Sequence, residues 1–586
     1  MVLTSTLRVL LFALLLSFLP KCSRSAEDPA DLILLNGTFW TGNPEQRSAT
    51  AVAIRRGRLV LVGDADEAMI HRGPFTELID LNGAFVVPGF NDNHVHFASA
   101  ARFLEFNLMR VRSQDEFLER TQEVVEHLES GEWILGGYWG AYDQLAEGST
   151  AGEAADRFTP DIALIEELTA RNPLYIQVFD NSSFAVNTAA LVAAGLDPER
   201  PTAPGVVFER NSEGKPTGIL WGRGVGALFS PVVPREFSNK RRLSQSRQAL
   251  VEIRRYGVTS ISDMSDDQQL EIYRQLRSRD QLTVRVHFRP DLERWKVLAR
   301  QAIRVGSGDD WIRLGAVRGH IDGIMGTSSA RFFEPYSHQP CNRGQWRRLM
   351  ADENGEFVEG RFLGYMERAD LAGLQLSIHA VGDEANALLL DYLEELNRLN
   401  GEKDRRVRLV HAQVIRDQDF LRLGRLGVVA EVQPFHLSGE MRWMEEKIGH
   451  ERCRGAYAFR RLHEAGAVLS FGSDWPGTSA AEYPINPMLG LYAAVTRQTV
   501  TGDPAGGWFP EERVAMETAL RAYTLGTAYG NFEENVKGTI EVGKLADLTV
   551  LSNNLLEIPP SEILKTEVLY TIVGGRIVYR REGMGN

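Results

Sequence analysis

The feature that most constrains the fold is a series of short apolar runs that alternate with helical patterns through the middle of the chain. Because apolar strands without a polar face must be covered on both sides, this alternation predicts a parallel sheet flanked by helices. About eight such units are expected to close into an α/β fold of the TIM-like (β/α)8 barrel type. The runs are Leu174–Val178, Val258–Ile261, Val284–Phe288, Leu314–Val317, Leu374–Ile378, Val407–Val410, Val428–Val432 and Val468–Phe471.

The two ends of the chain differ from this middle. Residues 27–88 and 536–586 contain short strands separated by tight turns such as Asn36-Gly37. Strands this short need partners, so we expect the two ends to pair into one small composite β-sandwich. The barrel is then expected over residues 89–535, with an insertion around residues 135–235, which are too many for one β/α unit.

Composition narrows the class of partner. The chain has 586 residues, a net charge of −13 and 43% hydrophobic residues, which is ordinary for a globular protein. Nucleic-acid binding depends on clustered Lys and Arg, so the acidic balance argues against a nucleic-acid partner. We expect a small-molecule substrate, and the sequence leaves open whether the chain forms a homodimer.

The N-terminus predicts the compartment. Arg8 is followed by the apolar run Val9–Leu16 and then by small residues up to Ala26. A run of about a dozen apolar residues is too short to span a bilayer but has the length of a signal-peptide core. Residues 1–26 are therefore predicted to be a cleaved signal peptide of a secreted or extracytoplasmic protein, with an uncleaved membrane anchor as the alternative. Cleavage would leave Cys341 and Cys453, which form one bridge or none.

Metal-binding residue types stand where several predicted strands end. His94 and His96 are two residues apart, so their side chains point to the same face of a strand. His379, His411 and Asp474 each follow an apolar run. Barrel enzymes build their active sites at the C-terminal ends of the strands, where these side chains would converge on one ion.

Longer motifs around these residues resemble the amidohydrolase superfamily, in its N-substituted formamide deformylase-like branch (amidohydrolase family 3). They extend in order over nearly all of the chain after residue 26. The resemblance implies a metallohydrolase barrel that cleaves amide-like C–N bonds with a metal-activated water. The motifs are Pro88-Gly-Phe-Asn-Asp-Asn-His94-Val-His96, Asp322-Gly323, Glu334-Pro-Tyr336, His379-Ala-Val-Gly-Asp383, His411-Ala-Gln413, Gln433-Pro-Phe-His436, Gly472-Ser-Asp474-Trp-Pro476 and Gly543-Lys-Leu-Ala-Asp547.

The resemblance also implies roles for single residues. His94 and His96 would be ligands from the first strand, and His379 and His411 the histidines of the fifth and sixth strands. Asp474 would be the eighth-strand aspartate, which binds metal and takes a proton from the water.

Three departures from the family pattern matter. Two-metal relatives bridge their ions with a carbamylated Lys, whereas this chain has Arg318, which stays protonated and is a poor carbamate former. The branch has Asp-Gly-His where this chain reads Asp180-Asn-Ser182, and Glu where this chain has Val410. We therefore predict one divalent ion per chain, with zinc expected, bound by His94, His96, His379 and Asp474.

The predicted function is hydrolysis of a non-peptide C–N bond in an N-formyl, N-acyl or cyclic amide. Asp474 and His411 are the predicted catalytic residues, and His411 would orient the water or the developing oxyanion. Four further residues are candidates for substrate binding: Arg318, Asp322, His436 and Trp475. A structural ion pair with Asp322 is the alternative for Arg318, and loop packing is the alternative for His436. Two other functions compete: a catalytically inactive binding protein, and a deaminase or lactonase on the same barrel.

Overall fold

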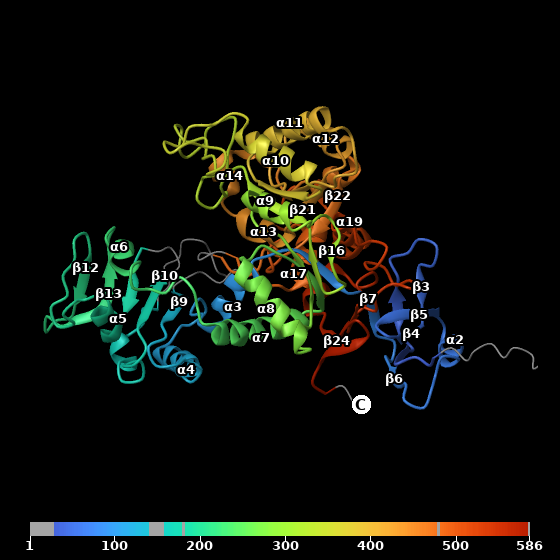
Figure 1. The fold of residues 1–586 in the computed structure, drawn as a ribbon, viewed down its shortest axis with the longest axis horizontal. Coiled ribbons are helices and arrows are strands. Elements are labelled where there is room, and N and C mark those ends of the chain that lie inside the picture. The colour runs from blue at the N-terminus through green and yellow to red at the C-terminus, as the bar shows by residue number, and fades with distance from the viewer. Residues whose placement is uncertain (1–27, 140–157, 179–181, 478–480, 584–586) are drawn as a thin grey trace, which may run out of the picture.

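The computed structural model describes residues 28–139, 158–178, 182–477 and 481–583, which form a mixed α/β fold. The predicted signal peptide and the sequence positions Asp180 and Asn181 lie outside the described residues. Figure 1 shows a central part built around β21 and β22, with the strands β9, β10, β12 and β13 on one side of it. The N-terminal strands β3–β6 lie on the opposite side.

The first half of the central part is a mostly parallel sheet with the strand order β16-β17-β15-β14-β8. Only β16 runs antiparallel to its neighbour. The strands of this sheet are β8 (Phe90–Val95), β14 (Val258–Asp263), β15 (Arg285–Phe288), β16 (Ser307–Gly308) and β17 (Ile312–Leu314).

The second half is a fully parallel sheet with the order β18-β19-β20-β21-β22. Every one of its strands coincides with a predicted apolar run or its neighbourhood. The strands are β18 (Ala316–His320), β19 (Gln375–Ala380), β20 (Arg408–His411), β21 (Val429–Val432) and β22 (Val468–Phe471).

The two sheets are connected at two places. Gly315 separates β17 from β18 with a φ of +115°, and an added Cβ there would lie 2.3 Å from the Arg304 carbonyl oxygen. Only glycine fits this position. The chain passes through Gly315 directly from β17 in the first sheet to β18 in the second. At the other edge, Val95, the last residue of β8, forms a parallel bridge with Trp475, which follows β22.

Helices follow most of these strands, as the alternating pattern predicts. They are α3 (Phe97–Glu105), α7 (Asn239–Arg255), α8 (Asp267–Ser278), α9 (Trp295–Arg300), α10 (Arg361–Leu371), α11 (Asp383–Asn400), α12 (Phe420–Arg425), α13 (Pro434–Glu440), α14 (Met444–Ile448), α15 (His450–Cys453), α16 (Phe459–Glu464), α17 (Pro487–Thr496), α18 (Met516–Arg521) and α19 (Thr527–Gly530).

One predicted run was placed wrongly in the series. Leu174–Val178 forms β10, which pairs with β9 and β11 rather than with the parallel strands of the central part. Leu174–Val178 was the first run of the predicted series, and the first strand of the central part is instead β8. The sequence of β8, FNDNHV, is largely polar, so a search for apolar runs does not find it. The sheet that contains β10 has the order β12-β13-β11-β10-β9. Its other strands are β9 (Ile134–Trp139), β11 (Phe184–Val186), β12 (Val207–Arg210) and β13 (Pro216–Trp221), with helices α4 (Gln114–Val125), α5 (Thr188–Ala193) and α6 (Val225–Phe229) nearby in the chain.

Strands from both ends of the chain share a sheet. It has the order β25-β24-β23-β7-β2-β3, and β7 pairs antiparallel with β23. A second, four-stranded sheet, β5-β4-β1-β6, contains N-terminal strands alone. The strands are β1 (Leu32–Leu35), β2 (Thr38–Trp40), β3 (Ser48–Ala49), β4 (Ala51–Arg55), β5 (Arg58–Gly63), β6 (Glu77–Asp80), β7 (Phe85–Pro88), β23 (Leu548–Leu551), β24 (Val568–Val573) and β25 (Arg576–Arg580), with α2 (Ala65–Met69) beside them.

A buried ionic network connects the two central sheets. The Arg289 guanidinium, just after β15, donates to both carboxylate oxygens of Glu431 on β21, at 2.8 and 3.2 Å. Arg408 on β20 pairs with the same carboxylate, and all three side chains are fully buried. Glu431 therefore holds strands from opposite sheets together.

Both cysteines that the structure describes are free thiols, with Cys341 exposed and Cys453 buried. The helices in the described ranges include none with the length and apolar character needed to span a bilayer.

Candidate metal centre

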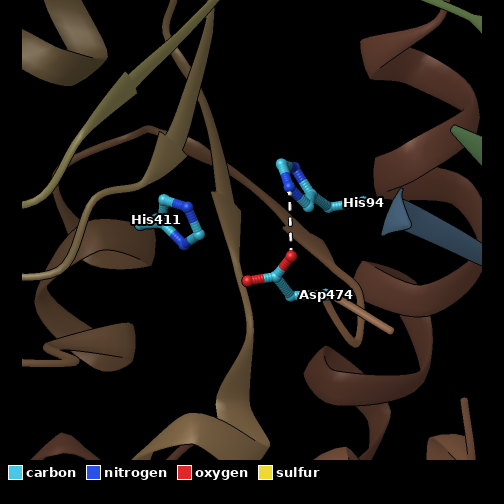
Figure 2. A group of neighbouring side chains, drawn as sticks. All are labelled: His94, His411 and Asp474. Carbon is cyan, nitrogen blue, oxygen red and sulfur yellow. Dashed lines mark ion pairs between the residues drawn. The ribbon is translucent and has the colours of Figure 1, made fainter. Parts of the chain in front are cut away.

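The contact between β8 and the segment after β22 brings the predicted metal ligands together. The Asp474 N–H donates to the His94 carbonyl oxygen, and the His96 N–H donates to the Trp475 carbonyl oxygen, each at 2.8 Å. Asp474 itself has a left-handed backbone with a φ of +62°. Figure 2 shows the resulting arrangement, in which the side chains of His94 and Asp474 point toward each other and His411 faces both.

Three potential ligand atoms form a small triangle. The Nε2 atoms of His94 and His96 lie 3.3 Å apart, and Asp474 Oδ1 lies 3.3 and 3.2 Å from them. Ligands bound about 2.0–2.1 Å from a tetrahedral ion are separated by about 3.3 Å, so this triangle has the dimensions of one face of such a site.

His379 and His411 complete a ring of imidazoles. His379 is the penultimate residue of β19 and His411 is the last residue of the neighbouring strand β20, and their ring centroids lie 4.6 Å apart. His379 Nε2 lies 3.0 Å from the Gly323 carbonyl oxygen, which can only accept, so Nε2 carries the proton and Nδ1 is the nitrogen left for an ion. His411 Nδ1 lies 2.8 Å from Gln433 Oε1, which can only accept. Nδ1 of His411 therefore carries the proton, and its Nε2 is free of one.

The position of His411 differs from what the sequence suggested. His94, His411 and Asp474 each offer a ligand atom within 4.8 Å of the other two, which is the spacing of a metal-binding group. Ligand histidines donate their other ring N–H to a carbonyl or carboxylate oxygen, and both His379 and His411 have such a partner. The residue types and their partners therefore fit a divalent ion.

The protonation states in the site suit metal binding. Burial lowers the pKa of His94 and of His379 to about 4, and burial together with His379 holds the pKa of His411 well below its usual value. Burial alone would raise the pKa of Asp474, but the adjacent His94 and His96 outweigh it and hold that pKa well below the usual range. Neutral imidazoles and an ionised carboxylate are the forms that bind metal ions.

Arg318 does not pair with Asp322, the partner that we considered. Its Nε donates to Asp291 Oδ1 at 2.7 Å, and its Nη1 donates to the Met264 carbonyl oxygen. Asp322 is fully buried and accepts backbone N–H groups from Val381, Gly382 and Arg331. Asp322 thus fixes the loop after β19, whereas Arg318 reaches across the ends of the first sheet.

His436 and Trp475 are buried neighbours of Asp474. His436 Nε2 lies 3.7 Å from Asp474 Oδ2, and its ring stacks on Tyr483 with centroids 3.9 Å apart. Burial lowers the pKa of His436. Trp475 is 3% exposed and packs edge-on against Phe97. Both residues shape the wall beside Asp474.

His320 is a further histidine of this region that the sequence motifs do not single out. It ends β18 directly opposite His379, and the two ring centroids lie 5.2 Å apart. The rule that found His379 and His411, a histidine at the end of a strand, would have found it too.

Comparison with known proteins supports the same assignment. The amidohydrolase family matches residues 77–579 of the chain. Protein LONG AFTER FAR-RED 3 of Arabidopsis thaliana is 32% identical over 563 residues, which are 94% of this chain and 92% of that protein. N-substituted formamide deformylase of Arthrobacter pascens is 26% identical over 94% of this chain and 99% of its own length.

Solved structures agree with the family match. An uncharacterized metal-dependent hydrolase from Pyrococcus furiosus superposes with a TM-score of 0.69 at 25% identity, over 90% of this chain and all of that chain. An adenosine deaminase from Xanthomonas campestris with bound zinc has a TM-score of 0.51 at 15% identity, over 95% of both chains, and shows likeness of fold alone. The chain belongs to the amidohydrolase family and is a metal-dependent hydrolase.

Proposed function

We propose that the chain hydrolyses a non-peptide C–N bond in a small N-formyl, N-acyl or cyclic amide. The observation that carries this proposal is the triangle of His94 Nε2, His96 Nε2 and Asp474 Oδ1, with edges of 3.2–3.3 Å. The name of the deformylase relative supports the choice of an amide.

The proposed cofactor is one zinc ion per chain. The proposed ligands are His94, His96, Asp474 and the Nδ1 atom of His379. A zinc ion bound there would lower the pKa of a coordinated water to about 7 and polarise a substrate carbonyl. A single ion is proposed because Arg318 stands where two-metal relatives have a carbamylated Lys, and Arg is a poor carbamate former.

The protein side chains would handle the proton and the developing charge. Asp474 Oδ2 is the oxygen not used in the triangle, so it would accept the proton of the attacking water and return it to the leaving nitrogen. His411 Nε2 would orient the water or the developing oxyanion, since its Nδ1 proton is held by Gln433.

For the architecture we propose that the two central sheets form one (β/α)8 barrel over residues 89–535, with an insertion around 135–235. The Val95–Trp475 bridge and the continuous chain through Gly315 support closure. The sheet shared by β7 and β23 supports a composite β-sandwich of residues 27–88 and 536–586. A crystal structure with an open edge at β8 or β22 would argue against the barrel.

Removal of the ion should abolish activity. Dialysis against a chelator is expected to remove turnover of N-formyl and N-acyl amines, and one equivalent of Zn²⁺ should restore it. Elemental analysis of the purified protein gives the stoichiometry, and a screen with cyclic amides, aminopurines and lactones tests the substrate class. Bound zinc without hydrolysis of any amide, or a clear preference for an aminopurine or a lactone, would contradict the proposal.

For localisation we propose export with cleavage near Ala26, on the basis of the apolar run after Arg8. Mature protein is expected outside the cytoplasm with an N-terminus at Ala26 or Glu27. N-terminal sequencing of the exported fraction is the measurement, and recovery of an intact Met1 would instead favour the membrane anchor.

A further inference from the structure

A second feature lies at the same end of the strands as the metal centre. A cavity of about 320 Å³ opens over the ends of β15 and β18. Six of its lining residues are charged or ionisable: Asp291, Glu293, Arg318, His320, Arg347 and Arg348. We call this cavity the arginine recess.

Two of the three arginines in the recess are neutralised. Arg318 pairs with Asp291 at 2.7 Å, and Arg348 pairs with Glu293. Arg347 differs, because no carboxylate of the described residues lies within 4.0 Å of its guanidinium. Its Nε donates to the Asp322 carbonyl oxygen at 3.0 Å, which fixes the side chain, while the two terminal nitrogens have no hydrogen-bond partner in the described part of the chain. The recess therefore presents one fixed guanidinium with two spare donors.

His320 connects the recess to the metal centre. It lines the recess and also lies beside His379, with ring centroids 5.2 Å apart. Arg347 is anchored to the backbone of Asp322, whose carboxylate lies 3.6 Å from His379 Nε2. His320 thus borders both the recess and the histidines, and a substrate that extends past His320 would place a second group beside Arg347.

We propose that the arginine recess binds a carboxylate of the substrate, so that the amide hydrolysed is an N-formyl or N-acyl amino acid. The planar guanidinium fork of Arg matches a carboxylate with two parallel hydrogen bonds. The recess contains three arginines and two acidic residues, which leaves one net positive charge. A monoanionic carboxylate balances this charge, whereas the acidic side chains disfavour a phosphate dianion. This inference rests on the proposed amide hydrolysis.

The experiment compares two substrates that differ only in the carboxylate. Zinc-loaded enzyme is assayed with N-formylphenylalanine and N-formyl-2-phenylethylamine. We expect kcat/KM to be about 10- to 100-fold higher for the acid, the range of a hydrogen bond to a charged group. Arg347→Gln should remove this preference, mainly through the KM of the acid. Arg348→Gln is the matched control, because its side chain is 83% exposed and paired with Glu293, and should keep the preference.

Binding to the metal-free protein gives a readout that is independent of turnover. Calorimetry should detect tighter binding of the acid than of the neutral amide, and Arg347→Gln should abolish the difference. If Arg347→Gln does not fold, Arg347→Lys keeps the charge without the fork and should weaken binding of the acid alone.

The outcomes separate the two proposals. Equal kcat/KM for both substrates, unchanged in Arg347→Gln, would overturn the carboxylate assignment while amide hydrolysis stands. Hydrolysis of neither substrate would count against the proposed function, and the calorimetric comparison would then decide on the recess. If Arg348→Gln also removes the preference for the acid, the preference arises from the general positive charge of the surface, and the role of Arg347 is overturned.

Discussion

Asp474→Asn is expected to lower kcat by about 10³-fold or more, since the loss of a general base alone costs about 10²- to 10⁴-fold. The substitution removes the proton acceptor at Oδ2 and the negative charge at Oδ1, which lies 3.2–3.3 Å from both His94 and His96. Zinc content should also fall, because a neutral amide is a poorer ligand than a carboxylate. Steady-state kinetics and elemental analysis of the same preparation measure the two effects.

His411→Asn is the matched comparison for this substitution. It removes an imidazole at a similar depth but leaves the triangle intact, so we expect most of the zinc to remain while turnover is lost. Two tightly bound ions per chain, one of which His411→Asn releases, would make His411 a ligand. The single-ion proposal would then be wrong. His94, His411 and Asp474, whose ligand atoms lie within 4.8 Å of one another, would then be ligands of one of the two ions.

Glu431→Gln is expected to lower the free energy of unfolding by about 3–5 kcal/mol, the usual cost of removing one partner from a buried ionic network. The variant would leave Arg289 and Arg408 facing each other without a counter-ion, and all three side chains are fully buried. Chemical denaturation followed by tryptophan fluorescence and circular dichroism measures the change.

A surface pair gives the control for this stability effect. Glu395 and Arg398 form an ion pair on α11 with partly exposed side chains, so Glu395→Gln should not change stability measurably. Equal stability losses in the two Gln variants would show that burial of the network contributes nothing special. Wild-type stability in Glu431→Gln would mean that water or a neighbouring group satisfies the arginines.

The sequence predicted those parts of the site that depend on local pattern. A histidine or aspartate that follows an apolar strand must lie near the strand end, so His379, His411 and Asp474 could be placed without coordinates. The predicted strands of the second sheet agree with β18–β22 within a few residues. The family assignment from ordered motifs is confirmed by the match over residues 77–579.

Side-chain direction and pairing over long separations could not be read in this way. Arg318 and His320 are two residues apart and so lie on the same face of β18. Arg318 nevertheless turns toward Asp291, whereas His320 lies beside His379. Which partner a long side chain takes depends on loops that are distant in sequence, here the one after β15. A search for apolar runs likewise misses β8, because four of its six residues are polar. Hydrogen bonds satisfy these buried polar groups: Asn93 donates to the Ser470 carbonyl oxygen, and the His94 N–H donates to the Asp92 carboxylate.

The pairing of β7 with β23 has a consequence for synthesis of the chain. These strands lie roughly 460 residues apart in sequence. The buried ion pair between Arg285 and Asp547 spans a further long separation, of 262 residues. At about 5–20 residues per second, a ribosome needs about 20–90 s to make the missing partner. During that time the edge of β7 that faces β23 has no partner, although its other edge can pair with β2. The sheet is therefore completed only when the C-terminal strands have been made, and chaperones that shield exposed strand edges should associate with the nascent N-terminal segment.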